Sequence, residues 1–347
     1  MKNRKREICT SGSVRDEDGQ PPHLLGRRQF LHLTAGAAAL PAVSRIAKAQ
    51  AYPTRPVRWI IPFPPGGGAD TVTRIVGQWL SERLGQPVIL EHRPGGGTNI
   101  GTQTMVNSPP DGYTLLFFGV SAAINATFYA TLPFNLQRDI APVAGLIDFR
   151  LALVAHPSVP AQTVVELITY AKAHPGKISI GSFGTGTVSH VAGELFKMMT
   201  GVNLVHVPYR GGAPLVIDLL SGQVQVAFDV LTTSLPHIRS GALRALAMAE
   251  KTRFDQLPDV PTIDDAVPGY EASVWAGVGV PRSTPSEIIE RLNREINAGL
   301  MNPTIKARLA EVATTPKIFT PAEFGAHVAA EIEKWRRVIK FAGIRAE

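Results

Sequence analysis

The sequence lacks most of the patterns that mark an enzyme or a metal protein. Its 347 residues include one cysteine, Cys9, so the chain cannot form an internal disulfide or a cysteine metal site. It contains no G-x-S-x-G nucleophile turn, no H-E-x-x-H zinc motif and no lysine-bearing phosphate loop. The histidines after residue 50 are scattered without the spacing of metal ligands. These absences argue against nucleophilic and metal chemistry, and we expect neither a cofactor nor a metal.

The first 50 residues predict an export signal. Arg27 and Arg28 precede a mildly apolar run, LHLTAGAAALPAV, which is typical of a twin-arginine signal peptide. This run is too short to span a bilayer, and no apolar run after it is long enough to do so. We expect cleavage near Ala49 or Ala51, a mature chain that begins around Tyr52, and a periplasmic location. The general secretory route stays open as the alternative to twin-arginine export.

Most of the excess positive charge lies in this leader. The whole chain carries a formal net charge of +7, and residues 1–50 contain nine Lys/Arg and four Asp/Glu, so about +2 remains for the mature protein. No basic run with interleaved aromatic residues follows. The composition therefore gives no reason to expect a nucleic-acid partner.

Beyond residue 51, strand-like and helix-like segments alternate. Apolar residues fall on one stripe in residues 70–84 and again in 188–199, and three further helices are expected from Pro285 onward, the last at 321–341. This alternation predicts an α/β fold of mixed, mostly parallel sheets flanked by helices. The expected strands cover residues 57–61, 88–91, 114–118, 152–155, 177–180, 204–207, 224–228, 243–247 and 274–280.

A glycine turn between the first strand and the first helix is the most informative segment. Gly66, Gly67 and Gly68 have no side chains to shield their N–H groups, and the following helix adds the positive end of its dipole. Pro64 and Pro65 stiffen the entrance to this turn. The segment predicts a site for a small anion.

A second glycine turn, SFGTGTVSH at residues 182–190, offers hydroxyl groups beside glycines. Hydroxyl and amide donors suit a carboxylate because they add no net charge. Ser189 stands where a dinucleotide fingerprint has its third glycine, which argues against a Rossmann site. The candidate donors and glycines of this turn are Ser182, Gly184, Thr185, Gly186 and Thr187.

Several residues near these turns have two interpretations each. Asp70 either caps its own helix or faces an ammonium group of the ligand. His190 either packs inside its helix or contacts the ligand. Asp229, at the end of a strand, is equally a site residue or a helix cap, and Ser121 follows another strand in the same position. Arg210 meets an anionic ligand, an acidic side chain or solvent.

Taken together, the motifs resemble the solute receptors of tripartite tricarboxylate transporters, the Bug-type extracytoplasmic receptors. The resemblance covers essentially residues 52–345. It rests on FPPGGGADT, RPGGGTNIG, DGYTLL, ATLPFNLQRDIAPV, GSFGTGTVSHVAGELF, VPYRGGAPLVIDLLSGQVQVAFD and WAGVGVPRSTP, which follow one another in the family's order.

The resemblance implies a two-lobed periplasmic-binding-protein fold (type II-like) that closes on its ligand. Strand-like segments around residues 148–155 and 245–250 are candidate crossings between lobes, which would place residues 52–148 and 250–347 in lobe 1 and residues 149–249 in the inserted lobe 2. The resemblance also implies capture of a small carboxylate for a membrane permease, without catalysis. Carried over by motif, the first wall holds Phe63, Pro65, Gly66, Gly67 and Asp70, the opposing wall holds Ser182, Gly184, Thr185, Gly186, Thr187 and His190, and Ser121 and Asp229 lie near the ligand.

Two departures from the family pattern concern the pocket. Two prolines precede the first glycines where one is usual, and Phe183 stands where smaller residues are common. Two other functions stay open: an exported α/β enzyme acting on an organic acid, with His190 and Asp229 as its acid–base pair, and a receptor that feeds a sensor protein.

Overall fold

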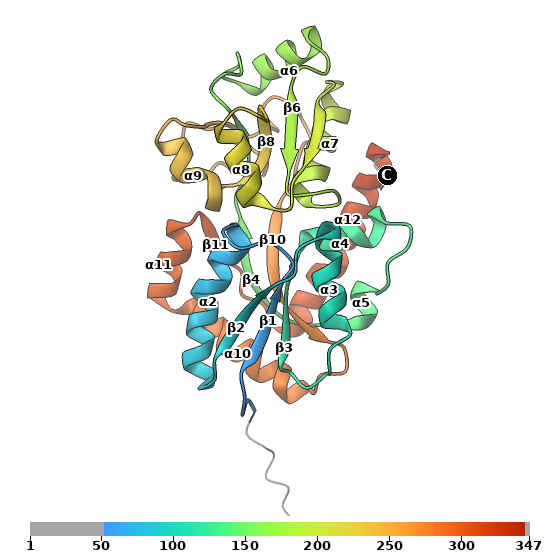
Figure 1. Cartoon of the computed structure of the whole chain (residues 1–347), viewed down its shortest axis with the longest axis vertical. Coiled ribbons are helices and arrows are strands. Elements are labelled where there is room, and N and C mark those ends of the chain that lie inside the picture. The colour runs from blue at the N-terminus through green and yellow to red at the C-terminus, as the bar shows by residue number, and fades with distance from the viewer. Residues whose placement is uncertain (1–51, 344–347) are drawn as a thin grey trace, which may run out of the picture. The chain divides into compact units, whose positions relative to one another are not determined.

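The structure is a computed structural model that describes residues 52–343 (Figure 1). The expected export signal, its cleavage site and Cys9 lie outside the described residues. Two mixed β-sheets organise the described chain, and helices flank both of them. The α/β fold class is therefore confirmed.

The first sheet has six strands in the order β11-β4-β10-β3-β1-β2. Strand β1 (Val57–Ile61) pairs in parallel with β2 (Val88–His92) and β3 (Thr114–Gly119). Strand β10 (Val274–Pro281) pairs antiparallel with β3 and with β4 (Ile140–Phe149), and β11 (Thr314–Pro316) adds to β4. Residues from both ends of the described chain thus share one sheet.

The second sheet has five strands in the order β7-β6-β8-β5-β9. Strand β6 (Ser179–Ser182) pairs in parallel with β7 (Val205–Pro208) and β8 (Val226–Val230). Strand β5 (Leu151–Ala155) pairs antiparallel with β8 and with β9 (Arg244–Met248). Every strand of this sheet comes from the middle of the sequence.

Helices cover both sheets and connect their parallel strands. In Figure 1, α2 (Gly68–Leu84) and α11 (Pro303–Glu311) lie to the left of the first sheet, and α3 (Asn99–Val106), α4 (Val120–Phe128) and α5 (Leu136–Asp139) lie to its right. Helix α10 (Ser286–Met301) contacts α2 and β4. The second sheet carries α6 (Val164–Ala173), α7 (Val188–Thr200), α8 (Gly212–Leu220) and α9 (Leu231–Arg239).

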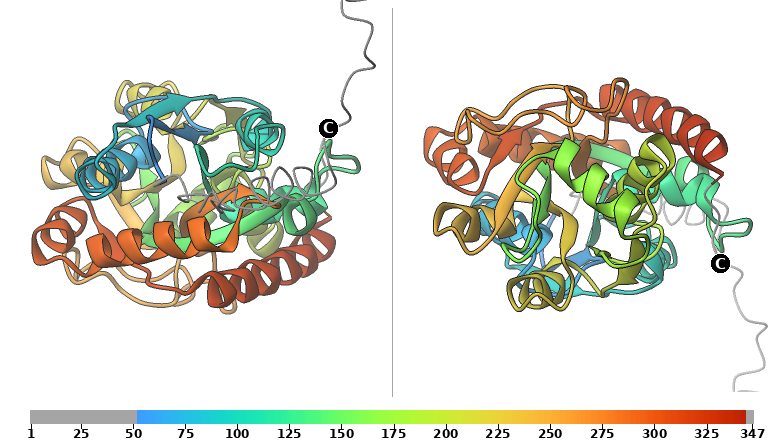
Figure 2. Two further views of the ribbon diagram at one scale, coloured as in Figure 1. Left: turned by 90° about the horizontal axis from the view of Figure 1, so that it is seen from below. Right: turned by 90° about the horizontal axis from the view of Figure 1, so that it is seen from above.

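The last helix, α12 (Pro321–Ala342), contacts both α4, which flanks the first sheet, and α7, which flanks the second (Figure 2). Trp335 of α12 is fully buried, as is Trp59 in β1 of the first sheet. The indole N–H of Trp335 donates to Glu331 over 3.3 Å. This helix therefore stabilises the packing of both halves.

Two stretches of chain pass between the sheets side by side. Only Arg150 separates β4 from β5, and the chain returns through Ala249 after β9. The Ala249 N–H donates to the Leu151 carbonyl over 2.8 Å, and the Leu151 N–H donates to the Glu250 carboxyl group over 3.0 Å. Burial raises the pKa of Glu250 to about 7. These two bonds join the crossings where they pass from one sheet to the other.

All nine strands expected from the sequence overlap strands of the structure, whereas β4 and β11 were not predicted. Pro142 and Gly145 interrupt the apolar pattern of β4, and the sheet accepts the proline because the β4–β10 pairing is irregular beside it. Five of the nine pairings between named strands are antiparallel. The sheets are mixed as expected, with more antiparallel pairing than the sequence indicated.

Candidate ligand-binding site

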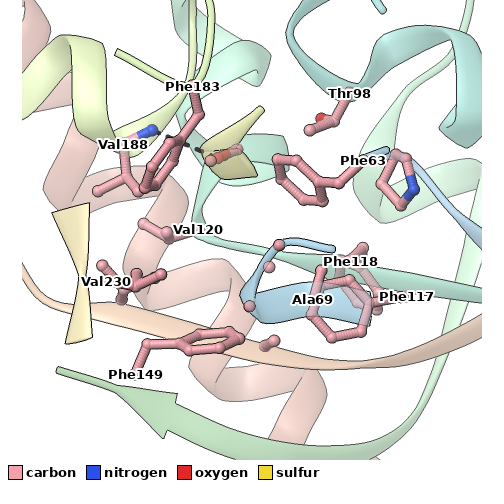
Figure 3. A pocket seen from close by; sticks show the side chains of 18 of the residues that line it. Phe63, Ala69, Thr98, Phe117, Phe118, Val120, Phe149, Phe183, Val188 and Val230 are labelled. Carbon is pink, nitrogen blue, oxygen red and sulfur yellow. Dashed lines mark hydrogen bonds between the residues drawn. The ribbon is translucent and has the colours of Figure 1, made fainter. Parts of the chain in front are cut away.

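A cavity lies where strands of the two sheets end and helices begin (Figure 3). We call it the inner cavity; its volume is about 70 Å³. It is lined by Pro62, Phe63, Pro64, Gly67, Gly68, Ala69, Thr98, Phe117, Phe118, Gly119, Val120, Ser121, Ala122, Phe149, Phe183, Val188, Gly212, Val230, Val274, Trp275 and Ala276.

Aromatic and aliphatic side chains form most of this wall. Phe63 packs edge-on against Phe117, and Phe118 packs edge-on against Trp275, with ring centroids 6.5 and 6.1 Å apart. The Trp275 indole N–H donates to Glu331 over 2.8 Å, so a residue outside the lining satisfies its polar atom. No charged side chain is among the described residues that line the inner cavity.

Four helix N-termini reach the same cavity. Gly67, Gly68 and Ala69 begin α2, Gly119 to Ala122 begin α4, Val188 begins α7 and Gly212 begins α8. The first N–H groups of a helix have no partner within the helix. None of these four helices is capped by its own N-cap side chain, and the same is true of α3, α9 and α10. The cavity therefore faces a set of main-chain donors without charged side chains.

Two hydroxyl groups complete the polar part of the wall. The Val188 N–H donates to Ser121 Oγ over 3.3 Å, the bond drawn as a dashed line in Figure 3, which joins the start of α7 to the start of α4. Thr98 lies beside Phe63, is 5% exposed, and its Oγ1 has no hydrogen-bond partner in the structure. Its φ of 88° is a left-handed conformation that threonine rarely adopts. Strain and an unsatisfied buried hydroxyl at one residue are typical of a functional position.

A larger space of about 510 Å³ lies next to the inner cavity and shares Phe63, Thr98 and Phe183 with it. We call it the outer cavity. Its wall contains glycine turns 95–97 and 184–187 in part, with Tyr129, Tyr209 and Arg210. Arg210 is exposed, and it is the charged side chain among the described residues of this wall.

The first glycine turn is organised by Asp70. The Gly66 N–H donates to Asp70 Oδ2 over 2.9 Å, and Asp70 Oδ1 lies 2.9 Å from Arg74 Nε and 3.1 Å from His92 Nε2. Burial alone would raise the pKa of Asp70, but the Gly66 and Arg74 contacts outweigh it and hold this pKa below its usual value. Phe63, Gly67 and Gly68 line the inner cavity, whereas Pro65, Gly66 and Asp70 support the turn from outside the lining.

The second glycine turn is held by its own hydroxyl groups and by two histidines. Ser182 Oγ is hydrogen-bonded to His206 Nε2 at 2.7 Å and accepts the Gly184 N–H over 3.2 Å. Thr187 Oγ1 donates to the Gly184 carbonyl over 2.7 Å. Gly184, Thr185 and Thr187 line the outer cavity, and Ser182 and Gly186 lie in neither lining.

His190 supports this turn from below. Its Nδ1 accepts the Gly186 N–H over 3.3 Å, and its ring lies 4.2 Å from the His206 ring. Burial, with nearby His206 and Lys197, lowers the pKa of His190 to about 3, so the ring is neutral. The neutral ring therefore positions the turn by accepting the Gly186 N–H at Nδ1. His190 is absent from both cavity linings.

Asp229 is fully buried in β8 behind Gly212. Its Oδ2 accepts from Thr233 Oγ1 over 2.8 Å, while its Oδ1 has no partner. Burial raises the pKa of Asp229 to about 7. Within residues 52–343 no hydrogen bond or ion pair joins Asp229 to His190, so the structure does not assemble them as an acid–base pair.

The comparison with protein families identifies the chain. Residues 72–344 match the family described as "Tripartite tricarboxylate transporter family receptor". The chain belongs to this receptor family. BugT of Bordetella pertussis is 37% identical over 315 residues, which cover 90% of this chain and 95% of BugT. The receptor is thus of the Bug type.

Solved structures of similar proteins share its fold. R. palustris Rpa4515 with adipate is 36% identical, with a TM-score of 0.82, and the match covers 85% of this receptor and 99% of that chain. The periplasmic binding protein BugD is 30% identical, with a TM-score of 0.82 over 85% and 100% of the two chains. MatC from Rhodopseudomonas palustris with bound malate is 28% identical, with a TM-score of 0.80 over 83% and 100%. The receptor therefore has the two-lobed fold of periplasmic binding proteins.

Sequence reasoning missed much of the receptor's apolar wall. Phe149 and Val230 stand at strand ends, the position at which ligands gather in α/β sheets, but β4 was not predicted as a strand. Thr98 belongs to a glycine turn that the sequence does mark, PGGGTN, and its place after three glycines was the available signal. Other wall residues from secondary-structure ends are Gly119, Val120, Gly212, Val274 and Trp275.

The part of the receptor that the structure describes contains no group of three or more His, Cys, Asp or Glu side chains placed to hold a metal ion. The same residues include no helix that is long and apolar enough to cross a membrane.

Proposed function

We propose that this receptor captures a small organic carboxylate in the inner cavity and delivers it to the membrane subunits of a tripartite transporter. The observation that carries the proposal is the meeting of four helix N-termini, none capped by its own N-cap side chain, at one cavity. Such N–H groups favour a negative charge. Family membership supports the same role, and adipate and malate in Rpa4515 and MatC supply examples of the ligand class.

The energy of these contacts suits a transport receptor. One helix end contributes about 0.3–1 kcal/mol, and up to about 2 kcal/mol where water is partly excluded. Four ends give roughly 4 kcal/mol, and burial of the ligand's apolar atoms adds about 25 cal/mol per Å². A dissociation constant near 1 μM requires about 8 kcal/mol in total, which these two sources can supply.

We propose that residues 52–148 with 250–347 form one lobe and residues 149–249 the other, and that the two crossings between the sheets form the hinge. The hydrogen bond between Ser121 and Val188 would then exist only in the closed state. A Cβ at Gly97 would clash with the Thr185 carbonyl oxygen, so a glycine there allows the two turns to meet. Closure excludes water and strengthens every polar contact to the ligand.

The family and the similar structures are binding proteins, which supports a role without catalysis. The proposal includes export of the mature chain to the periplasm, in keeping with the periplasmic binding protein BugD. It assigns the ligand contacts to Phe63, Gly67, Gly68 and Ser121 around the inner cavity, with Gly184, Thr185 and Thr187 at its approach. Asp70, Ser182, Gly186 and His190 hold these turns in place.

The test uses the purified chain from residue 52 to residue 347. A panel of carboxylates is screened by thermal shift, since a ligand that binds only the native state raises the melting temperature, and each hit is measured by calorimetry. Ser121→Ala should weaken binding roughly 2- to 10-fold, because one hydrogen bond contributes about 0.5–1.5 kcal/mol. The control is Ser221→Ala, which removes an exposed hydroxyl just after the C-terminal end of α8. If no carboxylate binds, the proposal is wrong.

Delivery is tested separately. Cells that carry the permease subunits are assayed for uptake of the bound acid with and without the receptor. Loss of uptake without the receptor supports transport, whereas unchanged uptake favours a sensor partner. Recovery of a chemically altered ligand after incubation would favour an enzyme.

A further inference from the structure

We propose that His92 is a positioning residue whose protonated ring bridges both ends of the first glycine turn, residues 63–70, and that ligand affinity depends on pH through this bridge. His92 is absent from both cavity linings, so it acts on the turn and not directly on the ligand. This inference rests on the proposed function and names a regulation of that same site.

Strand pairing fixes the place of His92. It is the last residue of β2 and stands opposite Ile61, the last residue of β1, in the parallel pair. The ladder continues for one more bond, because the Arg93 N–H donates to the Ile61 carbonyl over 2.8 Å. The glycine turn starts two residues after Ile61, so the His92 side chain, which is 17% exposed, lies beside its start.

The His92 ring contacts both ends of the turn. Its Nδ1 lies 2.8 Å from the Phe63 carbonyl oxygen at the start, and its Nε2 lies 3.1 Å from Asp70 Oδ1 at the end. Phe63 lines both cavities, and Asp70 accepts the Gly66 N–H over 2.9 Å. A bridge between these two points therefore fixes an aromatic residue of the wall and the glycine donors relative to each other.

These contacts require a hydrogen on each ring nitrogen. A carbonyl oxygen only accepts, so Nδ1 carries a hydrogen and donates it to Phe63. A neutral ring would then direct the lone pair of Nε2 at the Asp70 carboxylate, which is repulsive. A protonated ring is attracted to this carboxylate at 3.1 Å, even though Nε2 has no aligned hydrogen bond in the structure. Histidine side chains change charge between about pH 5 and 8, so the bridge to Asp70 forms or breaks in that range.

Asp70 stays ionised throughout this range. Burial alone would raise its pKa, but the Gly66 N–H, Arg74 and His92 outweigh burial and hold the pKa of Asp70 below its usual value. Arg74 of α2 shares Asp70 Oδ1 with the ring, at 2.9 Å. The Arg74 side chain is 61% exposed, so water screens its repulsion of a protonated ring.

The other elements around His92 supply no competing partner. On β2, Glu91 points to the opposite face of the strand and is paired with Arg58 of β1 and with Arg93. Residues 94–98, which follow His92, and helix α3 contain no ionisable side chain. Asp70 is therefore the counter-ion of the ring.

Protonation of His92 and binding of an anion favour each other. A turn that is held at both ends loses less freedom when the ligand arrives, so a protonated ring raises the affinity. The coupling between two binding events is reciprocal, so the bound anion favours the protonated ring in return. Ligand affinity should therefore fall as pH rises through the range in which His92 loses its proton.

The bridge itself is tested without ligand by nitrogen-15 NMR of the histidine rings, with the His92 signals assigned by their loss in His92→Asn. At about pH 6 both ring nitrogens of His92 should be protonated, and at about pH 8 only Nδ1 should carry a hydrogen. A neutral ring at pH 6 overturns the proposal, and so does a ring whose hydrogen stays on Nε2 alone.

The effect on affinity is tested by calorimetry at the same two pH values, with adipate as the first probe acid. His92→Asn retains a donor where Nδ1 lies but cannot become charged. It should bind roughly 3- to 10-fold more weakly than the wild type at pH 6 and equally at pH 8, because it lacks one charge-assisted contact. Urea unfolding checks that the variant is folded.

His174→Asn is the matched control. His174 Nδ1 also lies near a main-chain carbonyl oxygen, 3.1 Å from that of Tyr170, but at the end of α6 and outside both cavity linings. This variant should bind like the wild type at both pH values.

The ratio of wild-type to His92→Asn affinity is the decisive quantity. Burial raises the pKa values of Asp229 and Glu250 to about 7, and their titration affects both proteins alike. A ratio that is the same at pH 6 and pH 8 overturns the inference. If no acid of the carboxylate panel binds, the proposed function fails instead, and the ring spectrum still decides whether the bridge exists.

Discussion

Gly68→Ala is expected to weaken ligand binding while leaving the fold intact. Gly68 begins α2 and faces the inner cavity. A Cβ placed there would lie 3.1 Å from Phe149 Cε1, 3.1 Å from Val230 Cγ2 and 3.4 Å from Thr232 Cβ. Phe149 belongs to the first sheet and Val230 to the second, so we expect the added methyl group to push the two sheets apart beside the inner cavity.

The magnitude follows from overpacking. The two 3.1 Å contacts are tighter than ordinary van der Waals contacts, and inserting a methyl group into a filled space costs about 1–3 kcal/mol. Because 1.4 kcal/mol is tenfold in affinity, we expect Kd to rise roughly 5- to 100-fold. Stability without ligand should fall by less than this amount, because an open state relieves the contact with Val230 but not that with Phe149, and alanine is a better helix former than glycine.

Gly77→Ala in the same helix is the matched control. A Cβ at Gly77 would lie 3.4 Å from Leu90 Cδ2 and 3.9 Å from Trp59, which are ordinary contacts. This variant should gain about 0.5–1 kcal/mol in stability and bind the ligand like the wild type. Both variants are measured by calorimetry with one acid and by urea unfolding without it. A Gly68→Ala protein that binds within twofold of wild type would refute the reasoning.

Three further predictions concern stability. Burial raises the pKa of Asp229 from 3.8 to about 7, so the folded state keeps this proton between the two pH values and the free energy of unfolding falls as pH rises through that window. Asp229→Asn should reduce this fall when unfolding by urea is measured at several pH values. A pH profile identical to that of the wild type would contradict the assignment. Burial, His206 and Lys197 lower the pKa of His190 from 6.5 to about 3, so the free energy of unfolding falls as pH drops from about 6.5 toward 3. His190→Gln should reduce that fall when urea unfolding is measured over this pH range. Thr320 and Glu323 form a capping box at the start of α12. Thr320→Ala should lower the free energy of unfolding by about 1 kcal/mol in urea, whereas Thr320→Ser should not. Equal stability of the two variants would show that the cap is unimportant.

The sequence was sufficient for local structure where the apolar pattern was uninterrupted. Strands β1 and β3 and helices α2 and α7 were expected within two residues of their observed bounds, because period 2 and period 3.6 are visible in single segments. Strand β4 was missed because Pro142 and Gly145 break the pattern, and only pairing with β10 shows that the sheet tolerates them. Pairing depends on residues more than a hundred positions away.

The candidate site divides in the same way. The glycine turns at residues 66–68 and 184–186 were visible in the sequence, since glycine exposes main-chain donors wherever it occurs. The sequence did not show which residues line the cavity and which support the turns. Gly67 and Gly68 line the inner cavity, whereas Asp70, Ser182 and His190 form hydrogen bonds that hold the turns. Asp70 had two interpretations until the structure placed Arg74 and His92 beside it.

The sequence by itself determined that this chain is an α/β protein with glycine turns opening its helices, because strand and helix periodicity and missing side chains are local properties. Tertiary structure alone decided what those turns surround. Phe149, Val230 and Trp275 are far apart in the chain, and they become one wall only when two sheets place their strand ends together. The apolar character of the cavity is therefore a property of the assembled sheets, which no single segment encodes.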